Sequence, residues 1–301
     1  MINGIVNINK ESGYTSHDVV AKLRGITKQR KIGHTGTLDP DARGVLPICF
    51  GKATKVCELL TNQDKVYVTT LLLGKTSDTQ DISGKILSQR DVSFLTEEMV
   101  VECIKSFLGE SYQIPPMYSA LKVKGKKLYE LAREGIEIER KARKIIVHEI
   151  NILEMSLPRV KIEIRCSKGT YIRTICHDVG EKLKCGGLME ELWRTKVGQF
   201  TLSDSITIDE FREVFAAGKL EQILVRIDSI FEDYPKVWVK KGYESIAYNG
   251  NILTLEMLEN SQNVKRVRLY DCFQNFIGIY LVMESGGGEK RLKVEKMFYE
   301  R

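Results

Sequence analysis

The chain has 301 residues, of which 43% are hydrophobic and 29% charged, a composition typical of a folded globular protein rather than a disordered one. Its net charge of +6 is compatible with a nucleic-acid partner, although a solvated basic surface explains it equally well. The seven cysteines show no CxxC pair or zinc-type spacing, and we find no signal peptide or apolar run long enough to span a bilayer. We therefore expect a cytoplasmic protein with reduced thiols and no membrane contact.

The spacing of apolar residues predicts strands and helices in alternation. The first are a strand over 5–8 leading to Lys10, a helix capped by Ser16 and ended by Gly25, a helix over 53–60 and a buried strand over 66–73. The next are an amphipathic helix over 97–108, a helix over 126–133, an alternating strand over 160–166 and a helix that begins after 168–170. This order predicts a mixed α+β domain with functional residues at strand ends.

A linker near 232–236 separates the last part of the chain from the rest. We therefore expect one domain over residues 1–234 and a second over 235–301. In the second, apolar stretches at 276–283 and 291–298 flank Ser285-Gly286-Gly287-Gly288, which predicts a β-hairpin.

Residues 33–44 read Gly-His-Thr-Gly-Thr-Leu-Asp-Pro-Asp-Ala-Arg-Gly and form the most specific segment of the chain. Its glycines and Pro40 disfavour a regular helix or strand, so His34 and Asp39 are expected on a loop. An isolated Asp-Pro pair usually marks a turn, and a GxxG pattern alone is a weak sign of nucleic-acid binding. A polar loop that combines several glycines, a proline, a histidine and an aspartate is nevertheless more typical of a functional site.

This loop, continued to Lys55, closely resembles the catalytic motif of the TruB family of bacterial tRNA pseudouridine synthases. Segments resembling further motifs of that family follow in the same order at 65–68, 114–122, 168–174 and 192–200. The resemblance is dense over residues 1–200 and looser beyond. It implies a pseudouridine synthase fold, with a mixed, mainly antiparallel sheet flanked by helices and a small β-rich PUA-like RNA-binding domain at the C-terminus.

The resemblance also implies the reaction, which isomerises the T-loop uridine at tRNA position 55 to pseudouridine. The glycosidic bond breaks, the base rotates and C5 joins the sugar without redox change, so no cofactor or metal is expected. The sequence accordingly shows no Rossmann fingerprint, P-loop or metal-ligand cluster. An ionised carboxylate beside the base or ribose is needed, and Asp39 matches the family's catalytic aspartate. Whether it attacks the base, attacks the ribose or removes a proton stays open.

Further site residues are implied in the same way. Arg173 matches the arginine that pairs with the catalytic carboxylate. Tyr67 matches a tyrosine that stacks on the target base and is placed to assist a proton transfer. Tyr171 and Leu192 match positions that line the uracil pocket, although Leu192 alone would be interpreted as core packing. His34 matches a histidine that packs against the RNA where the target base has left its stack.

Contacts along the RNA must offset the cost of extruding a base. Candidate phosphate contacts, each of which is equally well explained as a solvated charge, are Lys10, Arg30, Lys31, Arg43, Lys122, Lys124, Lys126 and Lys127. Two positions depart from the family pattern. Glu11 follows Lys10 where a proline is usual, and Trp193 stands where a basic residue is usual.

Three interpretations are compared. The first is a stand-alone enzyme and the second is a tRNA-binding and folding module with incidental activity. Intact Asp39, Tyr67 and Arg173 favour the enzyme. A guide-RNA-directed synthase would be expected to have a long basic tail and partner proteins, and the chain ends at Arg301 without such a tail. We expect tRNA as the partner, no obligate protein partner and a monomer.

Overall fold

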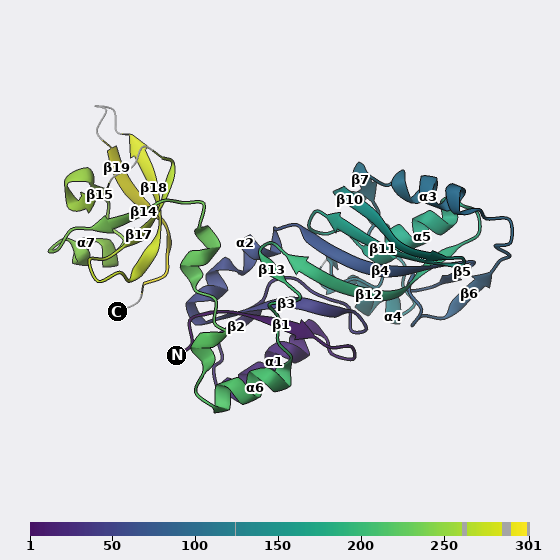
Figure 1. The fold of residues 1–301 in the computed structure, drawn as a ribbon, viewed down its shortest axis with the longest axis horizontal. Coiled ribbons are helices and arrows are strands. Elements are labelled where there is room, and N and C mark those ends of the chain that lie inside the picture. The colour runs from purple at the N-terminus through teal and green to yellow at the C-terminus, as the bar shows by residue number, and fades with distance from the viewer. Residues whose placement is uncertain (124, 261–263, 285–289, 300–301) are drawn as a thin grey trace. The chain divides into compact units, whose positions relative to one another are not determined.

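The computed structural model describes residues 1–123, 125–260, 264–284 and 290–299 (Figure 1). Lys124 and the 285–288 segment lie outside the described residues. The chain divides into two compact units. The larger unit comprises Val6–Cys49 and Val56–Ile223, and the smaller unit comprises Met1–Ile5, Phe50–Lys55 and Leu224–Arg301. In the described residues, no helix combines the length and apolar character required to cross a membrane.

The strands up to residue 223 are β1 (Gly4–Lys10), β2 (Ile32–His34), β3 (Arg43–Phe50), β4 (Lys65–Leu73), β5 (Lys75–Ser77), β6 (Ile86–Gln89), β7 (Gly109–Gln113), β8 (Lys122–Val123), β9 (Lys126–Lys127), β10 (Arg143–Ser156), β11 (Arg159–Cys166), β12 (Gly187–Val197) and β13 (Phe200–Thr201). The α-helices are α1 (Ser16–Thr27), α2 (Cys57–Thr61), α3 (Glu97–Lys105), α4 (Leu128–Arg133), α5 (Ile172–Lys182) and α6 (Ile208–Ala216). Short 3-10 helices cover Gly51–Val56 and Leu220–Gln222.

One nine-stranded sheet organises the larger unit. Its order is β1-β3-β12-β4-β11-β10-β7, with β2 paired to β3 and β13 to β12. The pairs from β12 through β4, β11 and β10 to β7 are antiparallel, whereas β12 and β3 run parallel. This confirms the expected mixed, mainly antiparallel α+β architecture. The alternation predicted for 160–166 is also confirmed, because Val160, Ile162, Ile164 and Cys166 are all fully buried on β11.

Helices α3 and α5 lie against the β10–β11–β4–β12 part of this sheet (Figure 1). Their apolar sides, including Val100 and Ile104 on α3 and Ile175 and Val179 on α5, join the inward residues of the strands in one core. Burial of each such side chain contributes about 1.5–3 kcal/mol relative to exposure. The core therefore fixes the N-terminal end of α5, where Arg173 stands.

The ends of α1 differ from the sequence-based prediction. Thr15, not Ser16, caps the helix: its hydroxyl accepts from the Asp18 backbone N–H, and Asp18 accepts in return from Thr15. The Ser16 hydroxyl is directed instead to the Leu38 backbone N–H at 2.9 Å. The helix also continues past Gly25 to Thr27 and is followed by Lys28 in the left-handed conformation, because a single glycine costs less than the packing of the helix face contributes.

The smaller unit carries a six-stranded sheet of order β15-β19-β18-β17-β14-β16. Its elements are η3 (Ile227–Phe231), β14 (Lys236–Val239), α7 (Glu244–Tyr248), β15 (Leu253–Thr254), η4 (Leu255–Met257), β16 (Leu258–Glu259), β17 (Arg266–Tyr270), β18 (Phe276–Glu284) and β19 (Lys290–Met297). The antiparallel pairing of β18 with β19 confirms the predicted hairpin. Buried residues such as Val237, Leu269 and Tyr280 form a separate core, so this β-rich unit packs on its own apolar interior.

Candidate active site

A glycine at the start of β3 fixes how the loop between β2 and β3 ends. Gly44 has φ +105, a conformation that L side chains rarely adopt. A Cβ at this position would also lie 2.2 Å from the backbone oxygen of Arg194 on β12. The end of the loop that carries Asp39 is therefore packed tightly against β12.

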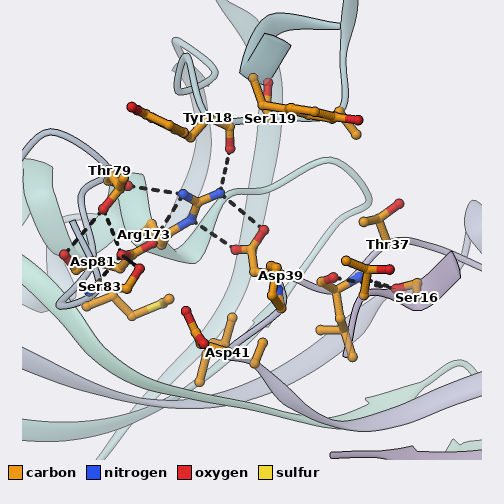
Figure 2. A pocket seen from close by; sticks show the side chains of 18 of the residues that line it. Ser16, Thr37, Asp39, Asp41, Thr79, Asp81, Ser83, Tyr118, Ser119 and Arg173 are labelled. Atoms are coloured by element: carbon orange, nitrogen blue, oxygen red, sulfur yellow. Dashed lines mark hydrogen bonds and ion pairs between the residues drawn. The ribbon is translucent and has the colours of Figure 1, made fainter. Parts of the chain in front are cut away.

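Asp39 is held by the Arg173 guanidinium in a two-point contact (Figure 2). Arg173 Nε lies 2.9 Å from Asp39 Oδ2, and Arg173 Nη2 donates to Asp39 Oδ1 at 3.2 Å. Arg173 is almost completely buried, whereas 38% of the Asp39 side chain is exposed. The planar fork of arginine matches a carboxylate in this geometry, so Asp39 is oriented while it remains open to a ligand.

Three further groups fix Arg173 from its other side, as Figure 2 shows. Nη2 donates to the Tyr118 carbonyl at 2.9 Å, and Nη1 donates to the Thr79 carbonyl at 3.0 Å and to Asp81 Oδ2 at 3.3 Å. The other oxygen of Asp81, Oδ1, accepts from the Thr79 hydroxyl and from Ser83. Arg173 thus has a fixed position between two carboxylates, Asp39 and Asp81.

The charges around Asp39 oppose each other. Burial in the protein raises the pKa of Asp39, and the neighbouring Asp81 carboxylate also raises it. The Arg173 guanidinium acts in the opposite direction and lowers this pKa, as does the Lys10 ammonium. Burial has the larger effect, so the pKa of Asp39 lies above its usual value, and Arg173 is the group that most strongly opposes its protonation.

Lys10 is completely buried at the end of β1. Its Nζ donates to the carbonyls of Glu11, Tyr14 and Pro40 at 2.6–2.9 Å, so each of its three N–H bonds has an acceptor. Burial lowers the pKa of Lys10 to about 8. This placement corrects the interpretation of Lys10 as a phosphate contact, because the ammonium holds the Asp39 loop through Pro40 and has no N–H left for RNA.

Arg194 on β12 also holds this loop in place, through hydrogen bonds to its backbone. The sequence analysis did not single out this residue. Only 1% of it is exposed, and its guanidinium donates to the carbonyls of Val45, Thr37 and Gly36 at 2.8–3.4 Å. It also forms a side-chain hydrogen bond with Tyr67, which is opposite Arg194 in the β4–β12 register. Burial raises the pKa of the Tyr67 phenol, and the Arg194 charge lowers it.

A cavity of about 1260 Å³ opens in front of Asp39. Asp39, Arg173, His34 and Leu192 all line it, so the structure brings these predicted residues together. Tyr67 and Tyr171 are not among the residues that line it, and Tyr67 is buried next to Arg194. Tyr171 precedes α5, and its backbone exchanges two hydrogen bonds with the Gln113 side chain at 2.8 and 3.0 Å. The described residues contain no group of three or more His, Cys, Asp or Glu side chains arranged to hold a metal ion.

The rings of His34 and His17 form a T-shaped contact, with centroids 5.1 Å apart. Its Nδ1 accepts a hydrogen bond from the Gly36 backbone N–H at 3.3 Å, which requires Nδ1 to be unprotonated. Burial, followed by the His17 charge, lowers the pKa of His34 to about 4. His34 is therefore neutral at physiological pH and offers a flat, uncharged ring to the cavity.

This burial predicts an acid-sensitive fold. The pKa of His34 falls from 6.5 in the unfolded chain to about 4 in the folded one, so the unfolded state binds the extra proton first as the pH falls. The free energy of unfolding should consequently decrease by about 3 kcal/mol through this group between pH 6.5 and 4. Urea titrations of the wild type and of His34→Gln, which keeps an acceptor for Gly36, measure the difference. A difference that does not vary over this pH range would contradict the prediction.

Comparison with known proteins places this geometry in a family. The N-terminal domain model of TruB family pseudouridylate synthases matches residues 24–172, and the C-terminal domain model of tRNA pseudouridylate synthase B matches residues 173–232. The tRNA pseudouridine synthase B of Lachnoclostridium phytofermentans is 49% identical over 93% of this chain and 95% of its own length. That of Alkaliphilus oremlandii is 44% identical over the full length of both. The chain belongs to the TruB family.

The fold is also similar to that of solved structures. One chain from the crystal structure of a Cbf5-Nop10-Gar1 complex has a TM-score of 0.71 and 27% identity, over 99% of this chain and 85% of its own. A chain from an H/ACA RNP bound to a substrate RNA containing 2'-deoxyuridine has a TM-score of 0.71 at 25% identity, over 99% of this chain and 86% of its own. The expected pseudouridine synthase fold is thereby confirmed.

Proposed function

We propose that this TruB family protein is a tRNA pseudouridine synthase that isomerises the T-loop uridine at tRNA position 55. The observation that carries the proposal is the Asp39 carboxylate, held by the buried Arg173 at two points and open to a cavity of about 1260 Å³. Relatives at 41–49% identity carry the name tRNA pseudouridine synthase B. A uridine extruded from the T-loop reaches Asp39 only through such an opening.

In this proposal each site residue has a distinct task. Asp39 is the reacting carboxylate, and Arg173 keeps it ionised and oriented. Leu192 and Tyr171 contact the uracil ring, and neutral His34 packs against the RNA where the uridine has left its stack. Isomerisation also requires removal of the proton from C5 after the base has rejoined the sugar. The Tyr67 phenol, hydrogen-bonded to Arg194, is the group we assign to assist that proton transfer.

The test is a map of pseudouridine in total tRNA from cells with and without the protein, paired with the purified protein acting on an isolated T-stem-loop. We expect pseudouridine at position 55 to disappear without the protein and to form on the stem-loop without any added cofactor. Tight tRNA binding without any turnover would instead support the alternative of a tRNA-binding and folding module.

Tyr67→Phe separates stacking from proton transfer. The variant keeps the aromatic ring and loses the hydroxyl, so RNA binding should be nearly normal while the turnover rate falls by roughly 10²–10⁴-fold. Tyr67→Leu, which loses the ring as well, should lose both affinity and turnover. Single-turnover kinetics on a T-stem-loop measure both quantities. Equal rates for the wild type and Tyr67→Phe would rule out the proton-transfer role.

We also infer that residues 235–301 form a PUA-like domain that binds RNA, supported by their separate core and their content of basic residues such as Lys265 and Arg266. Deletion of 236–301 should weaken binding of full-length tRNA and reduce its salt dependence, because fewer phosphates are neutralised. Chemistry on a minimal T-stem-loop should persist. A folded truncated protein that is inactive on the stem-loop would show that this segment helps to build the active site.

A single copy of the chain is sufficient in this proposal. All groups that contact Asp39 and line its cavity come from the larger unit of one chain. We therefore infer a monomer with no obligate protein partner, and, because its proposed substrate is tRNA, a cytoplasmic one. Sedimentation of the purified, active protein with and without tRNA tests this, and activity confined to a dimer would overturn it.

A further inference from the structure

A cation and an aromatic ring are paired on neighbouring strands at the edge of the cavity. Trp193 on β12 is in register with Arg43 on the parallel strand β3, and these strands lie side by side in the sheet (Figure 1). The Arg43 guanidinium carbon lies over the Trp193 ring, 5.4 Å from its centroid. Both side chains line the same cavity as Asp39. The pair is therefore continuous with the site in which the target uridine is proposed to react.

The pair has no evident structural task. Arg43 is exposed and Trp193 half-buried. In the described part of the chain, Arg43 has no carboxylate within ion-pair distance, unlike the saturated Arg173 and Arg194. The indole ring and the guanidinium beside it thus offer an aromatic and a cationic planar group to the cavity. Unstacked bases of single-stranded RNA bind to such surfaces, stacking on aromatic rings or on arginine planes.

The size of the cavity leaves room for a second base. Sites for a single small ligand are usually about 300–1,000 Å³. The cavity here, about 1260 Å³, exceeds that range. One extruded uridine over Asp39 and Leu192 therefore does not fill the space that extends to Arg43 and Trp193.

At this end of the cavity two carboxylates outnumber the single Arg43 guanidinium, which favours a base over a phosphate. Asp41 lies two residues before Arg43 and Glu191 two residues before Trp193, and both carboxylates line the cavity. Carboxylates repel a phosphate group, whereas they accept hydrogen bonds from the amino groups of bases. The chemistry of the surroundings therefore matches the face and edge of a base.

We propose that Arg43 and Trp193 form a stacking platform for a second unpaired nucleobase of the bound RNA, next to the target uridine. This inference rests on the proposed function and adds a binding subsite to it. It also gives Trp193, which replaces the basic residue usual at this position in the family, a defined role in RNA binding.

Tryptophan fluorescence provides the direct test, because the chain has only two tryptophans, Trp193 and Trp238. The T-stem-loop is titrated into Asp39→Asn protein, which prevents turnover, with and without Trp193→Phe. The difference between the two signals isolates Trp193. We expect RNA to quench this difference signal. The quench should disappear when one nucleotide other than the target uridine is made abasic.

Kinetics provide the second test. Trp193→Ala should raise the KM for the T-stem-loop by roughly 5- to 100-fold, the range expected for loss of one stacked base, with an unchanged single-turnover rate at saturation. Trp193→Phe keeps an aromatic face and should stay close to the wild type. Arg43→Lys keeps the charge without the plane and should resemble Arg43→Ala at high salt, when phosphate attraction is screened.

The outcomes distinguish this subsite from the proposed function. If wild-type protein turns over the stem-loop while RNA leaves the Trp193 signal unchanged, the platform is wrong and the synthase function stands. If only an abasic target position removes the quench, Trp193 contacts the target uridine itself, which also overturns the proposal. Absence of turnover on any tRNA would overturn the function itself.

Discussion

Asp39→Asn is expected to abolish pseudouridine formation, with a loss of at least about 10⁴-fold in single-turnover rate. The amide is nearly isosteric with the carboxylate, but it can act neither as a charged nucleophile nor as a base. Its Oδ1 can still accept a hydrogen bond from Arg173, whose other partners Tyr118, Thr79 and Asp81 remain. We therefore expect the fold and the tRNA affinity to be largely retained. Product formation on a T-stem-loop, together with filter binding, measures the two effects.

Asp41→Asn is the matched control for this variant. Asp41 belongs to the same loop and lines the same cavity, but it is exposed and has no contact with Arg173. Its neutralisation should change the single-turnover rate at saturating RNA by no more than a few-fold, because any effect through the Arg43–Trp193 subsite falls on RNA affinity. Turnover of Asp39→Asn near the wild-type rate, or an equal loss in Asp41→Asn, would contradict the assignment of Asp39 as the reacting carboxylate.

Arg173→Lys is expected to lower the single-turnover rate by roughly 10²–10³-fold although the charge is kept. One ammonium cannot bind both oxygens of Asp39 and reach the Tyr118 and Thr79 carbonyls at the same time. Arg173→Met removes the charge as well. Since the guanidinium lowers the pKa of Asp39, its loss should raise that pKa and move the acid limb of the pH–rate profile to higher pH.

Arg165→Lys serves as the comparison, because Arg165 is a partly exposed strand residue whose ion pairs with Asp64 and Glu149 lie outside this cavity. It should retain nearly full activity. If Arg173→Lys behaved in the same way at neutral pH, Arg173 would be an ordinary RNA contact, and another group would have to keep Asp39 ionised.

The motif at 33–44 and the segment at 168–174 predicted the placement of Asp39 beside Arg173, because each residue lies in a densely matched motif. The sequence analysis missed Asp81. The run of polar residues that directly follows 75–77 could have indicated a functional loop there. Arg194 was missed because its acceptors are carbonyls of a loop far away in the chain. Such contacts depend on the pairing of β12 with β3 and β4, and strand order cannot be derived from local periodicity.

For Lys10 the residue was identified but its exposure was not. It was expected on the surface as a phosphate contact, whereas it is completely buried. A lysine at the end of a strand is normally solvated, and only the folded loop supplies the three carbonyls that bury it. The helix ends show the same limit on a smaller scale. Ser16 and Thr15 are both good caps by residue type, and only the position of Leu38 decides which hydroxyl serves the helix.

The two buried cations beneath the Asp39 loop have a thermodynamic consequence for the encounter with RNA. Lys10 and Arg194 immobilise this irregular segment through its own carbonyls, at Pro40 on one side and at Gly36 and Thr37 on the other. The conformational entropy of the loop is therefore lost during folding and not again when RNA binds. Because the loop is already ordered, more of the free energy of RNA association is available for unstacking the uridine, which can occur only in the complex.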